Sequence, residues 1–366
     1  MIKVTLTNEI LRYITEIEQN RYKVSSVKLS KTVMNKLRKN SKKKSSYASN
    51  KIEGNPLSEK QVDEVIESDE RKHYLKPEQE VRNYFLALNY LEEKVSKKEK
   101  FSTKLILDVQ KLVEKGASKE KIGLRGPMPP GVLFAVYDSK TGNPDYIPPK
   151  YCDIPGLLDE LVEYVNTTDD HPLIVAAVVH YQLVTIHPFE DGNGRTARLL
   201  SGYIMDLNGY GFNGIGSLEE YFAYDIDEYY ESIQMGLPAL YYSGRENPPH
   251  PEIWINYFLK MVKLYSGKVC DLQLASEEED ITGSLSFLKG KEKELLQFLI
   301  KNYKGEFTPI EVSRKLSVTN KTIINRLAVL VKNGFVVPIL VNERIRSYEL
   351  SEFTRGHEKE IIKVIS

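Results

Sequence analysis

The residues best able to do chemistry lie in one string of twelve, His187 to Arg198, which reads His-Pro-Phe-Glu-Asp-Gly-Asn-Gly-Arg-Thr-Ala-Arg. The string combines an imidazole, two carboxylates, a Gly-Asn-Gly turn and two arginines. Histidine has an ordinary pKa that suits a general base near neutral pH. Planar guanidinium groups are well matched to phosphate oxygens. The string therefore predicts a base at the rim of a polyphosphate site.

The segments on either side of this string must position it. An apolar run, Pro172 to Ile186, leads into it, and a helical pattern, Thr196 to Leu207, follows. A loop that opens a helix presents unpaired N–H groups and the positive end of the helix dipole, so it favours a phosphate. Gly192 and Gly194 remove the side chains that would keep a phosphate away from the backbone. The two arginines that follow are three residues apart and share one helix face.

The string matches the motif of the Fic family, His-x-Phe-x-(Asp/Glu)-Gly-Asn-(Gly/Lys)-Arg-x-x-Arg, at every defined position. The chain thus resembles proteins that move the AMP part of ATP onto a hydroxyl side chain of a target protein. The resemblance implies that His187 takes the proton from that hydroxyl and that Asp191 holds Mg²⁺, an ion that prefers carboxylate and phosphate oxygens. It also implies that two arginines clamp the β- and γ-phosphates. The nucleotide-binding positions that it implies in this string are Gly192, Asn193, Gly194, Arg195, Thr196, Ala197 and Arg198.

A second motif lies upstream, at Ser49 to Gly54, which reads Ser-Asn-Lys-Ile-Glu-Gly. It resembles the inhibitory motif of the same family, (Ser/Thr)-x-x-x-Glu-(Gly/Asn). The resemblance implies that Glu53 pairs with Arg198, so that ATP binds with its α-phosphate misplaced for attack. An ion pair at about 4 Å is worth up to ~4 kcal/mol at an intermediate dielectric. In some relatives the same glutamate takes part in removal of AMP, and this role and self-modification stay open here.

Two further segments resemble parts of the Fic site. Tyr229 and Tyr230 resemble paired aromatic residues beside the adenine pocket, although tyrosines at helical spacing are also typical of a core. Gly123 to Pro149 is rich in glycine and proline and contains a β-prone run, Val132 to Tyr137. It resembles a β-hairpin flap that holds the acceptor segment of a target by strand addition. Relatives often carry an acidic residue three positions before the histidine, where this chain has Val184.

Composition narrows the setting of the protein. The 366 residues suffice for two or three domains, and 51 basic residues balance 51 acidic ones, so net charge indicates neither a nucleic acid nor a membrane partner. Cys152 and Cys270 lie far apart without ligand spacing, which favours a reducing cytoplasm. Met1 to Asn20 carries charges throughout, unlike a secretory signal. The longest apolar stretch, Leu173 to Ile186, is too short to span a bilayer. We expect a soluble, cytoplasmic protein.

The predicted fold class is mainly α: a Fic helical bundle with a small β-hairpin flap, followed by a C-terminal winged helix-turn-helix. The C-terminal expectation rests on two short helices that flank a turn near residue 318, followed by two strand-like runs. The predicted boundaries are an N-terminal helical region with the inhibitory helix at 1–95, a catalytic core at 96–266, a linker at 267–284, the winged helix at 285–354 and a tail at 355–366.

Two functions of different classes follow from these patterns. The first is a self-restrained protein adenylyltransferase that uses ATP and Mg²⁺ and modifies a Tyr, Ser or Thr hydroxyl of a target protein. The second is a nucleotide-sensing regulator that binds DNA through the winged helix. Pro309 to Arg346 carries seven basic and two acidic side chains, but no run of arginines suited to reading bases. The histidine favours the enzyme, because a sensor has no use for a base. Transfer of a different group, DNA binding and a homodimer stay open.

Overall fold

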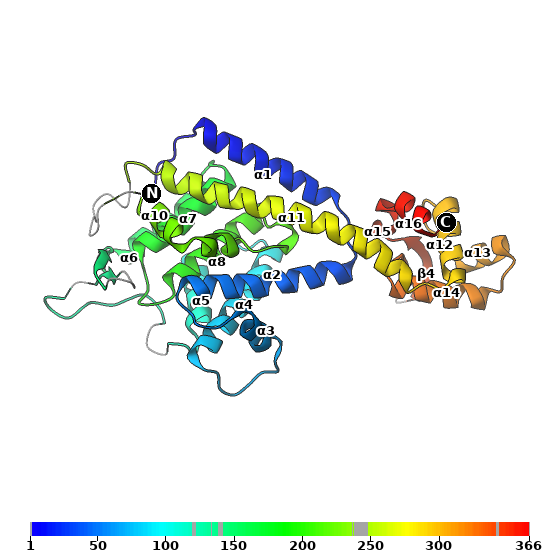
Figure 1. Ribbon diagram of the computed structural model, residues 1–366, viewed down its shortest axis with the longest axis horizontal. Coiled ribbons are helices and arrows are strands. Elements are labelled where there is room, and N and C mark those ends of the chain that lie inside the picture. Colours follow the sequence, from blue (N-terminus) through cyan, green and yellow to red (C-terminus); the bar gives the residue numbers. More distant parts are fainter. Residues whose placement is uncertain are drawn as a thin grey trace. The chain divides into compact units, whose positions relative to one another are not determined.

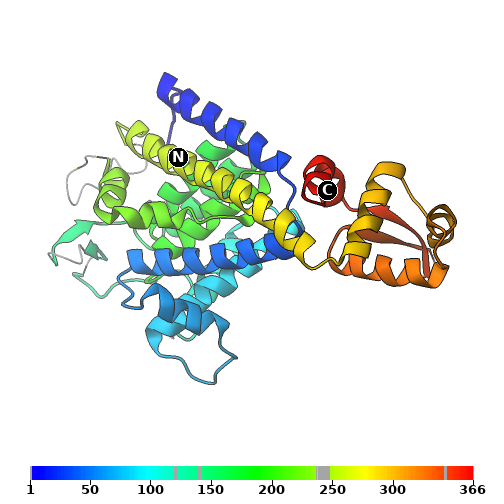
Figure 2. The same cartoon turned by 45° about the vertical axis from the view of Figure 1, so that its right-hand side comes forward.

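The computed structural model describes residues 2–118, 122–132, 134–137, 142–235, 237, 248–341 and 344–365, apart from the side chains of residues 32, 278–280 and 282. The chain divides into two compact units (Figures 1 and 2). The first unit comprises Met1–Arg21 and Arg38–Val269, and the second comprises Tyr22–Leu37 and Cys270–Ser366. Three long helices, α1, α2 and α11, run through the divisions between these segments.

Helices make up most of the first unit (Figure 1). Their bounds are α1 Asn8–Ser26, α2 Lys31–Ile52, α3 Glu59–Glu67, α4 Lys76–Ser96, α5 Thr103–Glu114, α6 Ile154–Thr167, α7 Pro172–Ile186, α8 Asn193–Leu207, α9 Glu219–Tyr224, α10 Ile226–Gln234 and α11 Glu252–Ser286. A short 3₁₀ helix, η1, covers Phe212–Gly214. This is the mainly helical core that the sequence predicts.

Helix α7 forms the centre of this unit. Nearly all of its side chains are buried, as expected of a helix that is apolar all round. Helix α8 packs along it, and α4 and α5 pack on α8 in turn. The indole Nε1 of Trp254 on α11 donates a hydrogen bond to the Ala177 carbonyl at 2.8 Å. The turn from α7 to α8 is therefore held by packing on several sides. No helix in the described part of the chain combines the length and apolar character needed to cross a bilayer.

A two-stranded antiparallel hairpin lies within the predicted flap. Strand β1, Val136–Tyr137, pairs with β2, Pro144–Tyr146, with Val136 opposite Tyr146. Leu133, in the predicted β-prone run, lies outside the described residues. The Tyr146 hydroxyl donates to the Thr185 carbonyl at 2.7 Å. This bond attaches the hairpin to α7 just before that helix ends.

The second unit contains the helix, turn, helix and hairpin order that the sequence predicts. Its elements are α12 Gly290–Asn302, α13 Pro309–Leu316, α14 Asn320–Lys332, β3 Val336–Val341, β4 Arg344–Leu350, α15 Glu352–Gly356 and α16 Glu358–Ile365. Thr308 and Glu311 form a capping box that starts α13, with Pro309 in its first turn. Ser317 ends α13 in the left-handed conformation. Strands β3 and β4 pair antiparallel. The assignment of this order to a winged helix stays a prediction.

The structure differs from two of the predicted boundaries. The segment 267–284, expected to be a linker, lies within α11, and Ile281 is 6% exposed in the core of the second unit. Its acidic and serine-containing composition suggested a linker, but Val269, Gln273 and Ile281 fall at helical spacing and are buried. The segment 355–366, expected to be a tail, completes α15 and forms α16, where Ile361 is fully buried. An amphipathic pattern of isoleucines accounts for this helix.

The burial of α16 gives a test of this correction. Ile361→Ala should lower the free energy of unfolding of the second unit by about 2–5 kcal/mol, because it opens a cavity in a packed core. Val364→Ala, at a half-exposed position of the same helix, should change it by less than about 0.5 kcal/mol. Hydrogen exchange of the α12 and α14 amides measures both. Equal, small effects would show that residues 355–366 do not belong to this core.

Candidate active site

A short loop joins α7 to α8 and carries the predicted chemistry. The loop begins at His187, whose backbone is left-handed at φ 48°, and ends at Gly192, at φ 79°. Asn193 fixes the loop from within: its side chain accepts from the Phe189 N–H at 3.0 Å and donates to the Phe189 carbonyl at 2.9 Å. The Phe189 ring is only 1% exposed. The loop is therefore pinned to the core, with His187 at one end and the start of α8 at the other.

The imidazole of His187 is oriented as a base. Its Nδ1 lies 3.3 Å from the Val184 carbonyl oxygen, which can only accept a hydrogen bond. This contact places the proton on Nδ1 and leaves the lone pair on Nε2. Burial lowers the pKa of His187 to about 4; the Val184 carbonyl opposes this shift, and Arg125 adds to it. The ring is therefore neutral near pH 7. Val184, where relatives often carry an acid, supplies the orienting contact through its backbone.

Arg125 ties this loop to the hairpin segment. Its backbone N–H donates to the Pro188 carbonyl at 2.9 Å, and its Nε donates to the His187 carbonyl at 2.8 Å. Its Nη2 donates to the Pro149 carbonyl, and its guanidinium lies 4.7 Å from the centre of the Phe134 ring. That ring lies 5.9 Å from the His187 ring. The Gly123–Arg125 triplet is a sequence signal for this segment, but it does not predict these contacts.

The start of α8 is shaped for an anion. The first turn of a helix leaves several N–H groups without a carbonyl partner. A Cβ at Gly192 would lie 2.6 Å from Glu114 Oε1, and a Cβ at Gly194 would collide with Glu53 Oε1. Gly192 is favoured by its positive φ, and the absence of a Cβ at both positions leaves room for the carboxylates of Glu114 and Glu53. Thr196 and Ala197, which the resemblance includes in the nucleotide site, are fully buried, so their side chains belong to the core.

Arg198 is buried and is held by four contacts. Its Nε donates to Ser49 Oγ at 2.8 Å, and its Nη2 donates to the Ser49 carbonyl at 3.1 Å. The same Nη2 lies 2.6 Å from Glu53 Oε1, and Nη1 lies 3.3 Å from the Tyr229 hydroxyl. Burial alone would lower the pKa of Arg198, but Glu53 and Tyr229 raise it above its usual value. The contact between Glu53 and Arg198 that the resemblance implies is therefore present.

The helix that carries Glu53 is anchored to the rest of the first unit. Glu53 directly follows α2. Ser45 on α2 donates from Oγ to Glu219 Oε2 at 2.8 Å, inside the protein, and Ser41 Oγ accepts from the Gly216 N–H at 2.6 Å. Lys43 forms ion pairs with α3 at Asp63 and Glu67. These contacts hold α2 to α3, to Gly216 and to the first residue of α9.

Arg195 has a different carboxylate partner. Its Nη2 lies 2.9 Å from Glu114 Oε1 and 3.4 Å from Asp191 Oδ1. The Arg195 and Glu114 side chains are 4% and 1% exposed. Burial raises the pKa of Glu114 to about 7; Arg195 lowers it and Asp191 raises it. Sequence reasoning missed Glu114, because nothing in its local pattern separates it from other helix glutamates.

The donor set fits a divalent metal on one side of the loop. The Asp191 side chain is 31% exposed, and its Oδ1 accepts from the Gly192 N–H at 2.8 Å. Across the described residues no group of three or more histidine, cysteine and acidic side chains is arranged to hold a metal. Mg²⁺ is commonly held by one or two carboxylates together with substrate phosphates and water. Asp191 suits that kind of site.

The two tyrosines that resemble adenine-pocket residues differ in exposure. Tyr229 is 1% exposed, and its hydroxyl lies 3.0 Å from His180 Nε2 as well as against Arg198. Tyr230 is 43% exposed, and its ring centre lies 5.2 Å from that of Tyr229. The ring of Tyr229 is thus enclosed by the core, whereas Tyr230 keeps an open face. Stacking of either ring on adenine stays a prediction.

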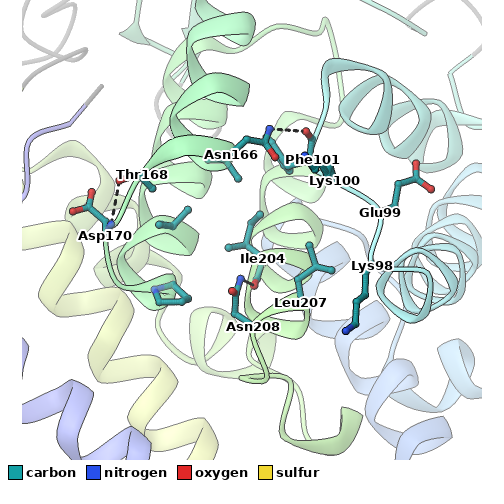
Figure 3. A pocket seen from close by; sticks show the side chains of 13 residues that line it. Lys98, Glu99, Lys100, Phe101, Asn166, Thr168, Asp170, Ile204, Leu207 and Asn208 are labelled. Atoms are coloured by element: carbon teal, nitrogen blue, oxygen red, sulfur yellow. Dashed lines mark hydrogen bonds between the residues drawn. The ribbon is translucent and has the colours of Figure 1, made fainter.

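A cavity of about 230 Å³ lies where α8 ends, away from these residues (Figure 3). Its labelled side chains include Asn166, which donates to the Phe101 carbonyl at 2.9 Å, and Asn208, which donates to the Ile204 carbonyl at 2.8 Å. None of the predicted site residues lines it. A second cavity, of about 140 Å³, reaches Arg198 beside α2. The chemistry therefore gathers at the opposite end of α8 from the larger cavity.

Comparisons with known proteins agree with this geometry. Residues 100–205 match the family model described as Fic/DOC family. The chain is 27% identical over 206 residues to the protein adenylyltransferase Fic of Drosophila grimshawi, covering 54% of this chain and 40% of that relative. It is 29% identical over 202 residues to the protein adenylyltransferase Fic of Aedes aegypti, covering 53% and 38%. The chain thus spans about two fifths of the length of these curated relatives.

Solved structures show the same fold. A Fic family protein from Desulfovibrio desulfuricans G20 is similar over 96% of this chain and 98% of its own, with a TM-score of 0.60 and 19% identity. Fic-1 from C. elegans is similar over 74% and 73%, with a TM-score of 0.56 and 23% identity. These likenesses confirm the predicted helical Fic fold. The segment that matches the Fic/DOC family model, residues 100–205, includes His187 to Arg198.

Proposed function

We propose that this chain is a protein adenylyltransferase, which moves AMP from ATP onto a hydroxyl side chain of a target protein. One observation carries the proposal. His187, whose Nε2 carries the lone pair, begins a six-residue loop that ends at the start of α8. Arg195 and Arg198 lie in the first two turns of that helix. The relatives named protein adenylyltransferase Fic, which the chain matches over part of their length, support the same reaction.

The reaction follows from the positions of these groups. The triphosphate lies along the N–H groups at the start of α8, with Arg195 and Arg198 on its β- and γ-phosphates. Nε2 of His187 takes the proton from the target hydroxyl. The hydroxyl oxygen forms a bond to the α-phosphorus, and the bond from that phosphorus to the β-bridging oxygen breaks. Pyrophosphate leaves, and AMP stays on the target. A positioned base of this kind typically contributes ~10²–10⁴-fold in rate.

Mg²⁺ bound at Asp191 would neutralise part of the charge on the phosphates. The residues of this chain position the base and the target. Arg125 donates to the carbonyls of His187 and Pro149, so one side chain holds the base next to the hairpin segment. The hairpin β1–β2 receives the acceptor segment of the target as an added strand. Recognition by backbone bonds leaves the choice among Tyr, Ser and Thr to the target.

Glu53 restrains this activity. Its carboxylate takes the Nη2 group of Arg198 that the γ-phosphate would need, at 2.6 Å. ATP that binds with Arg198 blocked holds its α-phosphate out of line with the target hydroxyl. The contacts of Ser49 with Arg198 support this restraint, because they keep the end of α2, which Glu53 directly follows, beside that guanidinium. The proposal also includes removal of AMP, with Glu53 taking part, and self-modification.

The same evidence favours an enzyme over a nucleotide sensor that binds DNA. A neutral imidazole with its lone pair on Nε2 can accept a proton from a hydroxyl, which an enzyme of this kind needs and a nucleotide sensor does not. We place the reaction in the cytoplasm, which agrees with a sequence that has only two cysteines, far apart in the chain.

The restraint predicts the outcome of two substitutions. Glu53→Gly should raise incorporation of label from α-labelled ATP with Mg²⁺ by at least tenfold, because Arg198 is released to the γ-phosphate. The added change His187→Ala should abolish the label. Glu163→Gly, which removes an exposed glutamate of α6 that makes none of the contacts anchoring α2, serves as the control and should leave incorporation near the wild-type level. Label that persists without His187 would assign the base elsewhere.

The low pKa of His187 predicts the pH dependence. Its pKa lies below the value of a free imidazole, about 6.5, so the ring stays deprotonated as pH falls through that value. The kcat/KM of Glu53→Gly for ATP, which reports the free enzyme, should therefore stay level from pH 7 to about pH 5 and fall only below it. Measurement at saturating Mg²⁺ across this range checks it. An acidic limb at pH 6.5 or above would contradict the assignment.

A further inference from the structure

We propose that Glu114, the last residue of α5, is a positioning residue that fixes Arg195 for the triphosphate and thereby sets the affinity of the site for ATP over AMP. The inference deepens the proposed function and rests on it. Glu114 lies outside the loop that carries the predicted chemistry, and no motif of the sequence includes it.

The first support is the buried contact between the two side chains. Glu114 Oε1 accepts from Arg195 Nη2 at 2.9 Å, and both side chains are at least 96% buried. Burying an arginine and a carboxylate costs free energy unless each has a well-placed partner. The pair therefore restricts the guanidinium to the plane and direction that Glu114 accepts.

The second support is the state of the remaining nitrogens of Arg195. Its Nε and Nη1 are buried, and neither has a hydrogen-bond partner in the structure. Buried donors without partners are uncommon, because each costs about 1–3 kcal/mol. Glu114 thus pairs with Nη2, while Nε and Nη1, which together carry three N–H groups, have no acceptor in the structure and can donate to anionic oxygens. Phosphate oxygens supply such acceptors.

The third support is the packing of α5 against the loop. A Cβ at Gly192 would lie 2.6 Å from Glu114 Oε1, so this carboxylate touches the turn that opens α8. One helical turn earlier on α5, Gln110 accepts from the Gly123 N–H at 3.0 Å and donates to the Asp191 carbonyl at 3.3 Å. One face of α5 therefore contacts both the loop between α7 and α8 and the start of the hairpin segment at Gly123.

Glu114 favours ATP binding by orienting Arg195, but its negative charge also repels the phosphates and so weakens ATP binding. A test must separate orientation from charge. Glu114→Gln removes the charge but keeps an oxygen that accepts from Arg195 Nη2, whereas Glu114→Ala removes both. If orientation dominates, the glutamine variant binds ATP like the parent and the alanine variant does not. AMP has no β- or γ-phosphate, so its affinity does not depend on Arg195.

The experiment uses the full chain with Glu53→Gly and His187→Ala, which frees Arg198 and blocks transfer. Calorimetric titration with ATP and with AMP, both with Mg²⁺, gives the two dissociation constants. Adding Glu114→Ala should weaken ATP by about 10- to 100-fold and change AMP by less than about twofold, and Glu114→Gln should weaken ATP by less than about threefold. Asp108→Ala, on another face of α5, is the matched control and should change neither.

Three results would overturn the inference: an alanine variant with parental ATP affinity, equal losses for ATP and AMP, or a glutamine variant as weak as the alanine variant. Normal AMP binding shows that a variant is folded. Glu114→Met keeps the volume without the acceptor and replaces the alanine variant if that one does not fold. A parent that binds no ATP would instead contradict the proposed function itself, so the two failures are distinguishable.

Discussion

The site depends on how buried arginine charges are satisfied at the start of α8. Arg198 is 3% exposed and cannot remain in the protein without an acceptor. Glu53 and Ser49 at the end of α2 supply it. Arg195, one turn away, has its own buried partner in Glu114. Phosphate oxygens can replace such carboxylates as acceptors, and the proposed function rests on this exchange. In the proposed function the two pairs play different roles. Glu53 competes with the phosphate for Arg198, whereas Glu114 leaves the Nε and Nη1 nitrogens of Arg195 without a partner.

The base, the glycines and the arginines of the site could be predicted because they lie within twelve consecutive residues. The loop His187–Arg198 needs its base, glycines and arginines within a few positions, and the structure keeps them at one turn between α7 and α8. The partner of Arg198 was within reach because Glu53 lies in a motif of its own. Glu114 and Arg125 were not, since their contacts join residues 81 and 62 positions apart and arise from helix packing. No periodicity marks a helix glutamate as the one that faces a loop.

For the fold too, elements that depend on neighbouring residues could be predicted, whereas burial that depends on distant contacts could not. The hairpin followed from a β-prone run with glycine and proline around it, and the turn at Ser317 followed from polar residues between two short helices. The boundaries predicted at 267–284 and 355–366 were wrong, because composition describes the exposed faces of these segments whereas Ile281 and Ile361 are buried in the core of the second unit. Tyr229 is a further case. Its spacing fits both a core and a nucleotide pocket, and only the packing shows that its hydroxyl reaches Arg198 and His180.

A crystal structure of the Glu53→Gly, His187→Ala variant with ATP and Mg²⁺ tests the central claim most directly. The account predicts the β- and γ-phosphates at the first turn of α8, in contact with Arg195 and Arg198, and the α-phosphorus facing the position of the missing imidazole. A triphosphate bound elsewhere, for example in the cavity at the far end of α8, with the first turn of that helix empty, would contradict it.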